Sequence, residues 1–90
     1  MFNERPQTQE IILTKLDTSR KLERPLKKGD SVSLRIGDER INVKIDTVSG
    51  SSFKGTITEF HPSRGLTFQQ LKLHDEIEFE TKHIFSASLA

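Results

Sequence analysis

The sequence predicts a mostly β fold, a small antiparallel barrel of five to six short strands. Residues 31–36 (SVSLRI) and 40–48 (RINVKIDTV) alternate apolar and polar side chains, which is typical of half-buried strands. Turn residues that include glycine recur at intervals of about ten residues, as they do between the short strands of small all-β domains. Gly55, inside a third apolar stretch, is typical of a bulge or of a sharp bend in a barrel strand.

The first third of the chain is less regular. Residues 1–8 are polar, contain Pro6 and are expected to form a loose tail, so that residues 9–90 make a single domain. Residues 9–16 (QEIILTKL) fit a helical turn and a strand about equally well, and we favour a strand because the rest of the chain has a β pattern. Residues 18–28 are expected to form a basic loop with at most one short helical turn near residues 18–24, because Pro25 would end a helix.

From residue 29 onward, turns and expected strands follow each other. Gly29-Asp30 leads into the strand 31–36, and a loop of about three residues containing Gly37-Asp38 joins it to 40–48 as a hairpin. A turn at 49–51 leads to a strand over 52–60, a loop over 61–65 follows, and residues 66–68 are expected to form a short strand. The last strand is expected over 75–85. One of its faces would carry Ile77, Phe79, Thr81 and Phe85, and the other Glu76, Glu78, Glu80 and Lys82. Strands of this number and length favour an SH3-like barrel first and an OB-like barrel second.

Two segments of the chain echo each other. Residues 26–34 read LKKGDSVSL and residues 71–79 read LKLHDEIEF, so both place Leu-Lys, two further residues, an Asp and then two alternating apolar positions. An Asp side chain restrains a turn by accepting hydrogen bonds from nearby backbone N–H groups. We interpret the echo first as a common way of turning into a strand, and second as duplication of a half-barrel. His74 takes the place of Gly29 and is expected to be a turn residue.

Composition excludes several kinds of protein. The 90 residues include no cysteine, which excludes disulfides, thiolate metal sites and a cysteine nucleophile. The first nine residues show no signal-peptide pattern, and no run approaches the roughly 18 apolar residues that span a bilayer. We therefore expect a cytoplasmic protein with no membrane partner. The net charge of +1 argues against a strongly electrostatic nucleic-acid binder.

No spacing of residues indicates catalysis or a metal site. His61, His74 and His83 do not pair at the intervals that metal ligands use, and neither a glycine-rich phosphate loop nor a nucleophile motif is present. We expect no enzymatic activity, no metal and no cofactor. His83 is expected to be a half-buried strand residue beside Phe79 and Phe85. His61 opens a loop, which makes it the histidine best placed to contact a ligand.

The basic stretch 15–28 is the strongest functional candidate. It carries six basic residues against two acidic ones, and in the functional interpretation these cations hold phosphate groups; in the alternative interpretation the stretch is a solvated loop. The chain has no Tyr or Trp, and its six Phe mostly occupy inward-facing positions, so a platform for stacking bases is not indicated. The candidate ligand-binding residues are Arg20, Lys21, Arg24, Lys27, Lys28, His61 and Arg64.

Residues 20–24 (RKLER) have the Arg-x-x-x-Arg spacing of PilZ domains, small barrels that bind cyclic di-GMP, and the chain resembles that family over about half its length. PilZ domains follow this motif with a hairpin and an Asp/Asn-x-Ser-x-x-Gly element. Residues 46–50 (DTVSG) offer the same residue types in a different spacing, and residues 52–55 (SFKG) supply Ser-x-x-Gly. The resemblance implies a cyclic-dinucleotide site at Arg20 and Arg24.

The function expected from the sequence is therefore a non-enzymatic β-barrel binding module whose ligand the sequence does not identify. One alternative is nucleic-acid binding through residues 15–28, and a second is PilZ-like cyclic-dinucleotide binding. A third is a protein-interaction module or a homodimer. The run of Glu76, Glu78 and Glu80 is interpreted as the solvent face of the last strand, or as a surface that faces a basic partner within the chain or across a dimer.

Overall fold

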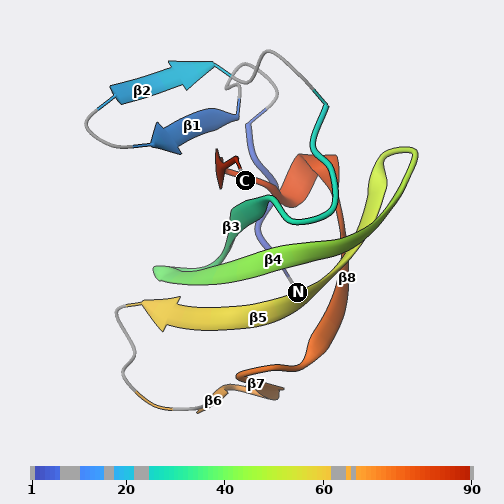
Figure 1. Cartoon of the computed structure of the whole chain (residues 1–90). Coiled ribbons are helices and arrows are strands. Elements are labelled where there is room, and N and C mark those ends of the chain that lie inside the picture. Colours follow the sequence, from blue (N-terminus) through green and yellow to red (C-terminus); the bar gives the residue numbers. More distant parts are fainter. Residues whose placement is uncertain are drawn as a thin grey trace.

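Strands make up most of the chain in the computed structural model, which describes residues 2–6, 11–15, 18–21, 25–61, 65 and 67–89 (Figure 1). A single turn of 3-10 helix, η1 (Thr81–His83), lies between the last two strands. Within these ranges, no helix has the length and apolar character that crossing a membrane requires. The strands are β1 (Ile12–Lys15), β2 (Thr18–Lys21), β3 (Ser31–Ile36), β4 (Glu39–Ser49), β5 (Ser52–His61), β6 (Thr67–Phe68), β7 (Leu71–Lys72), β8 (Glu76–Glu80) and β9 (Ser86–Ser88).

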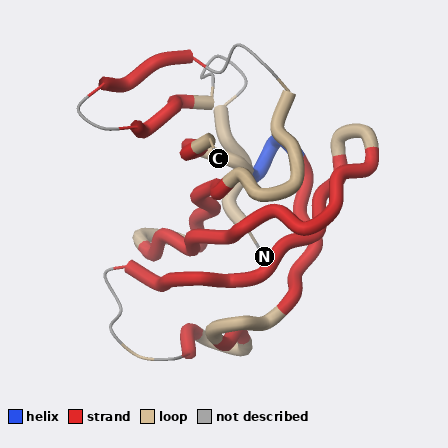
Figure 2. Tube along the Cα trace, viewed as in Figure 1, coloured by secondary structure: helices blue, strands red, loops and turns tan. Residues whose placement is uncertain are grey.

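Seven of these strands form one sheet in the order β2-β1-β9-β3-β4-β5-β8, and β6 pairs with β7 (Figures 1 and 2). The five strands from β9 to β8 pair antiparallel, whereas β1 runs parallel to β9. The last strand of the chain therefore lies between the β1–β2 hairpin and the first strand of the β3–β4–β5 meander. The predicted mostly β fold with an antiparallel sheet is confirmed. The described pairings leave β2 and β8 at the two edges of the sheet.

Several predicted strands are confirmed in place. The strand expected over 31–36 is β3, those over 40–48 and 52–60 lie within β4 and β5, and the 9–16 segment contains β1. The loop between β3 and β4 has two residues rather than three, because Ile36 pairs directly with Glu39. Gly37 begins this loop with a φ of 59°, and a positive φ at that position suits glycine in a two-residue hairpin turn.

Two predictions of local structure are wrong. Residues 75–85 do not form one strand: β8 ends at Glu80, η1 reverses the chain, and β9 begins at Ser86. The alternating pattern does not reveal this turn, because side-chain hydrogen bonds set it; the Glu80 backbone N–H donates to Nδ1 of His83 at 3.0 Å. The basic loop expected over 18–28 is also wrong at 18–21, which pair with β1 as strand β2, while residues 22–24 lie outside the described ranges.

Two bulges bend the long central hairpin. In β5, Thr58 is an extra residue between the pairs Asn42–Glu59 and Val43–Ile57; in β4, Asp46 is extra between the pairs formed by Ile45 and Thr47. A bulge increases the local twist and bends its strand. Gly55 pairs with Ile45 beside the second bulge, so its interpretation as the mark of a bulge is confirmed. The side chains that the sheet encloses form the core. Its buried apolar members are Ile11, Leu26, Val32, Leu34, Ile41, Val43, Ile45, Phe53, Ile57, Phe60, Leu71, Phe79, Ile84 and Ala87.

Residues 2–6, which the sequence assigns to the tail, connect the end of β3 to η1. The backbone N–H of Asn3 donates to the carbonyl of Arg35 at 2.7 Å, and that of Arg5 donates to the carbonyl of Lys82 at 2.6 Å. Phe2 packs against His83, with 6.0 Å between the ring centroids. His83 is half-buried in η1 rather than in a strand.

The two echoing segments form the same turn. Asp30 Oδ2 accepts a hydrogen bond from the Lys27 backbone N–H at 3.0 Å, and Asp75 Oδ2 accepts one from the Lys72 N–H at the same distance. Each turn also closes with a 3.1 Å backbone bond, from the Asp N–H to the Lys carbonyl. The equivalence extends to the sheet, since the first turn exchanges two backbone hydrogen bonds with Ile45 of β4 and the second exchanges two with Ile57 of β5.

The shared turn requires a positive φ at its third residue. That residue is Gly29, with φ of 97°, in the first turn, and His74, with φ of 73°, in the second. The prediction that His74 is a turn residue in the place of Gly29 is confirmed. A left-handed backbone conformation raises the free energy of a residue that has a Cβ by about 1–2 kcal/mol. Glycine has no Cβ and avoids the steric part of this strain.

We expect His74→Gly to stabilise the protein. The exchange removes the Cβ strain but adds backbone entropy to the unfolded chain, so the net gain should be about 0.5–1 kcal/mol. The reciprocal Gly29→His variant should lose about 0.5–1 kcal/mol, because it introduces the same strain and removes the same backbone entropy from the unfolded chain. Urea unfolding of both variants measures the two changes. A loss of stability in His74→Gly would mean that the imidazole has a structural role that its exposed position does not indicate.

Candidate functional site

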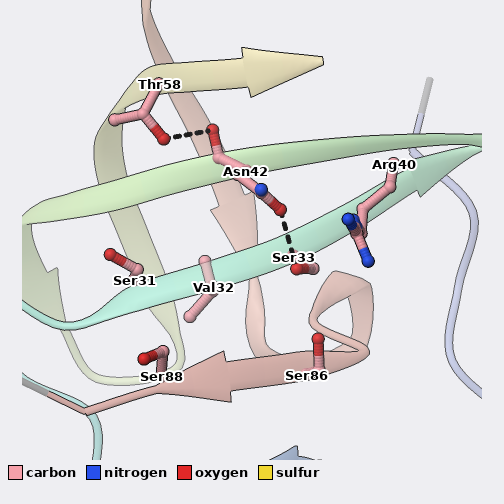
Figure 3. Close-up of a pocket in the computed structure, with 8 residues that line it drawn as sticks. All are labelled: Ser31, Val32, Ser33, Arg40, Asn42, Thr58, Ser86 and Ser88. Atoms are coloured by element: carbon pink, nitrogen blue, oxygen red, sulfur yellow. Dashed lines mark hydrogen bonds between the residues drawn. The ribbon is translucent and has the colours of Figure 1, made fainter. Parts of the chain in front are cut away.

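A polar groove crosses the outer face of the sheet, on the side away from the core. The alternation along β3 buries Val32 and Leu34 and turns Ser31, Ser33 and Arg35 outward. A hollow of about 310 Å³ lies over the adjacent parts of β9, β3, β4 and β5 (Figure 3). Its lining residues are Ser31, Val32, Ser33, Arg40, Asn42, Thr58, Ser86 and Ser88.

Hydrogen bonds between side chains fix the floor of the groove across three strands. The hydroxyl of Ser33 on β3 donates to Asn42 Oδ1 on β4 at 2.9 Å, and Asn42 Nδ2 donates to Glu59 Oε1 on β5 at 2.9 Å. The hydroxyl group of Thr58 donates a hydrogen bond to the backbone carbonyl of Asn42 at 3.2 Å. The β5 bulge makes this arrangement, because it places Thr58 and Glu59, both exposed, between the buried Ile57 and Phe60.

Arg40 is the charged residue that lines the groove. In Figure 3 its side chain leaves β4 and carries the guanidinium group over β3, on the side of Ser33. Ser86 projects from β9 toward the same space, whereas Ser88 lies at the other end of the groove, beside Ser31 (Figure 3). Among the described residues, no carboxylate lies within ion-pair distance of Arg40, since the ion pairs between them are Lys54–Glu78, Lys82–Glu4 and Lys82–Glu80.

The sheet register places a second arginine and a histidine beside Arg40. Arg35 is its direct partner on β3, and His61 is its direct partner on β5. Arg35 lies over the ring of Phe85, with its Cζ atom 5.1 Å from the ring centroid. Like charges directly opposite each other on paired strands destabilise a sheet by roughly 0.2–1 kcal/mol. The Arg35–Arg40 pair therefore destabilises the sheet locally by electrostatic repulsion.

Lys44 stands at the opposite end of the groove. It pairs with Ser31, is exposed, and forms no ion pair within the described ranges. Because Lys44 and Arg40 are four residues apart on one face of β4, about 13 Å separates them along the strand. The turn that holds Lys27 and Lys28 is hydrogen-bonded to Ile45, next to Lys44, and both of its lysine side chains are exposed.

Three glutamates lie on β8, at one edge of the sheet. Glu76, Glu78 and Glu80 are all exposed on β8, as the solvent-face interpretation predicts. Two of them have cationic neighbours, Lys54 at 3.7 Å from Glu78 and Lys82 at 3.8 Å from Glu80. The β3–β4 part of the outer face carries Arg35, Arg40 and Lys44 with Glu59 of β5 beside Asn42, whereas β8 carries the three glutamates.

The structure brings only part of the predicted site together. His61 lies beside Arg40 at the groove, while Lys27 and Lys28 lie near its Lys44 end. Arg20 and Lys21 are in β2, which β1 and β9 separate from β3. Arg24 and Arg64 lie outside the described residues.

Sequence reasoning missed most of the groove residues. Those on β3 and β4 could have been found from hairpin register, because a two-residue turn at 37–38 places residue 35 opposite 40 and residue 33 opposite 42. Ser86 and Ser88 could not, because β9 itself was not predicted. Within the described ranges, no three His, Asp or Glu side chains are arranged to hold a metal ion.

Comparisons with protein-family models, with curated proteins and with solved structures found no match for this chain. The candidate site accordingly rests on the geometry of the groove.

Proposed function

We propose that the protein is a non-enzymatic binding module that holds an anionic ligand in the polar groove, with Arg40 as the principal contact. The observation that carries the proposal is the position of Arg40, directly between Arg35 and His61 in the sheet register and without a carboxylate partner in the described chain. The hydroxyl of Ser86 nearby supplies a further donor.

An anion would compensate the cost of this arrangement. Two guanidinium groups on paired strands repel each other, and a ligand with negative charge between them turns that repulsion into two favourable contacts. Guanidinium groups also match phosphate and carboxylate oxygens with two parallel N–H donors, which suits Arg40 to this role better than a lysine. The hydroxyl of Ser86, which pairs with Ser33 near Arg40, can donate to the same ligand.

We further propose that the five antiparallel strands curl into an SH3-like half-barrel, with the groove on its outside. Three observations support this curvature. The central strands are long, 11 residues in β4 and 10 in β5, and both are bulged. The two ends of this hairpin have different partners, since β3 pairs with residues 39–44 of β4 and β8 pairs with residues 52–56 of β5. Bulges at such positions are the usual means of bending strands into a barrel.

A titration followed by ¹H–¹⁵N correlation spectra tests the proposal. Inorganic phosphate and then tripolyphosphate are added to labelled protein at low salt. We expect saturable shifts at Ser33, Arg40, Asn42 and Ser86, and little change at the β6–β7 hairpin. Shifts confined to residues 15–28, or no shift with either anion, would contradict the proposal.

Arg40→Gln should separate binding from stability. We expect the affinity for tripolyphosphate to fall about tenfold, because a charge-assisted hydrogen bond is removed. The free energy of unfolding should stay the same or rise by about 0.5 kcal/mol, because the repulsion from Arg35 ends. Lys72→Gln, which removes the same charge from an exposed turn, is the matched control and should change neither quantity.

The alternatives from the sequence remain predictions with their own tests. Nucleic-acid binding through residues 15–28 predicts that a Lys27→Gln/Lys28→Gln double variant loses more affinity than Arg40→Gln. The PilZ-like alternative predicts a saturable response to cyclic di-GMP that depends on Arg20 and Arg24. A homodimer predicts an apparent mass near twice 10.3 kDa in sedimentation.

A further inference from the structure

The groove combines groups that donate hydrogen bonds with groups that accept them, and we infer from this that its ligand is single-stranded RNA, bound through the ribose–phosphate backbone. This inference rests on the proposed function, since it names the class of anion that the groove takes. It concerns the groove on β9, β3, β4 and β5 and not the basic segment 15–28.

A simple anion would use only part of the groove. The oxygens of an ionised phosphodiester accept hydrogen bonds and carry no proton to donate, so they suit Arg40 and the serine O–H groups. Glu59 at the rim is an acceptor, and only one of its carboxylate oxygens, Oε1, is used by Asn42. The hydroxyls of Ser31, Ser86 and Ser88 can accept as well as donate. A ligand that carries hydroxyl groups beside its phosphates matches this mixture, and a ribose 2′-hydroxyl is such a group.

The positions of the cations indicate a polymer. Arg40 lines one end of the groove, and Lys44, the register partner of Ser31, adjoins the other end about 13 Å away along β4, with the hydroxyl groups between them. One phosphate group cannot contact both ends. A chain in which phosphates alternate with sugars can place one phosphate at each end and a ribose over Ser33, Asn42 and Glu59.

The groove offers the bases nothing to stack on. None of its lining side chains is aromatic, and the neighbouring ring of Phe85 is covered by Arg35. Stacking on exposed aromatic rings is the usual means by which single-strand binders hold bases. The ligand is therefore held by its backbone, and recognition depends on the sugar and not on the base sequence.

Fluorescence anisotropy with labelled 12-nucleotide strands tests the inference. The probes are oligouridine RNA, the 2′-deoxy strand of the same sequence and, as an acidic polymer of another class, a poly-glutamate peptide of similar charge. We expect RNA to bind about fivefold more tightly than the deoxy strand and more tightly than the peptide. With two phosphate contacts, at Arg40 and Lys44, the log–log salt slope should be about −1.4, or roughly a 7-fold loss between 50 and 200 mM salt.

Two matched acid variants locate the sugar contact. Glu59→Gln removes a carboxylate acceptor from the groove, so the preference for RNA over the deoxy strand should shrink toward onefold. Glu78→Gln removes the same charge from β8, where its partner is Lys54, and should leave the preference unchanged. Arg40→Gln should lower the affinity for the RNA and for the deoxy strand by the same factor, and it should reduce the magnitude of the salt slope by about 0.7.

The failures are distinguishable. Equal affinity for RNA and the deoxy strand, or tighter binding of poly-glutamate, overturns the inference of RNA while Arg40-dependent tripolyphosphate binding still supports the anion site. RNA preference that survives Glu59→Gln overturns the assigned sugar contact and with it the inference. If RNA, the deoxy strand and poly-glutamate all fail to bind in the groove, the proposed function itself is overturned.

Discussion

Gly55→Ala is expected to destabilise the protein by about 3 kcal/mol, near the upper end of the range for overpacked interiors. A Cβ at this position would lie 2.5 Å from Val43 Cγ1 and 2.6 Å from the Lys44 carbonyl oxygen. The valine side chain has few other rotamers, and the carbonyl is part of the β4 backbone, so neither neighbour moves easily. A domain of 90 residues has a total stability of roughly 5–13 kcal/mol, which makes this loss severe.

Urea unfolding of Gly55→Ala and Gly65→Ala measures this effect against a matched control. A Cβ on Gly65 would meet only the Thr67 backbone, at 3.7 and 3.9 Å, which is ordinary contact distance. Gly65→Ala should therefore unfold at nearly the same urea concentration as the original protein. Equal stability of the two variants would show that β4 and β5 separate freely at the bulge, contrary to the packing described above.

The strands that the sequence predicted well share one property, a single buried face. In β3, Val32 and Leu34 alternate with Ser31 and Ser33. This pattern indicates a strand with one buried face and one face in solvent. The missed element, β9, is only three residues long and has one buried side chain, Ala87. Three residues are too few to establish a period of two, and the preceding 3-10 turn depends on a hydrogen bond to His83 that no alternation predicts.

The candidate site was harder to predict than the fold, because strand register decides which charged residues lie next to each other, and the sequence alone does not give the register. Counting basic residues favours 15–28, where they are dense, over Arg35 and Arg40, which the β3–β4 turn brings opposite each other. Of the predicted candidates, His61 lies beside the groove because it pairs with Arg40. The positions of Thr58 and Glu59 depend on a bulge, and the sequence indicated only the other bulge, through Gly55.

The two equivalent turns allow a second large effect to be predicted with an internal control. Asp30→Ala should cost about 2–3 kcal/mol, whereas Asp75→Ala should cost about 1 kcal/mol, although each removes the same acceptor from a lysine backbone N–H. The difference lies in burial, since Asp30 is fully buried and Asp75 is partly exposed. Water can replace the carboxylate at residue 75, but a backbone donor left beside a buried alanine at residue 30 stays unsatisfied.

Thermal and urea unfolding of both alanine variants, with Asp30→Asn and Asp75→Asn beside them, distinguish burial from turn geometry. An asparagine keeps one side-chain oxygen as the acceptor, so both Asn variants should recover part of the loss. Equal losses in the two Ala variants would show that the turn itself sets the cost, whatever its surroundings. A larger loss at residue 30 would show that the same local structure stabilises the two halves of the sheet unequally, and that the turn before β3, adjoining the Lys44 end of the groove, is the more strongly constrained one.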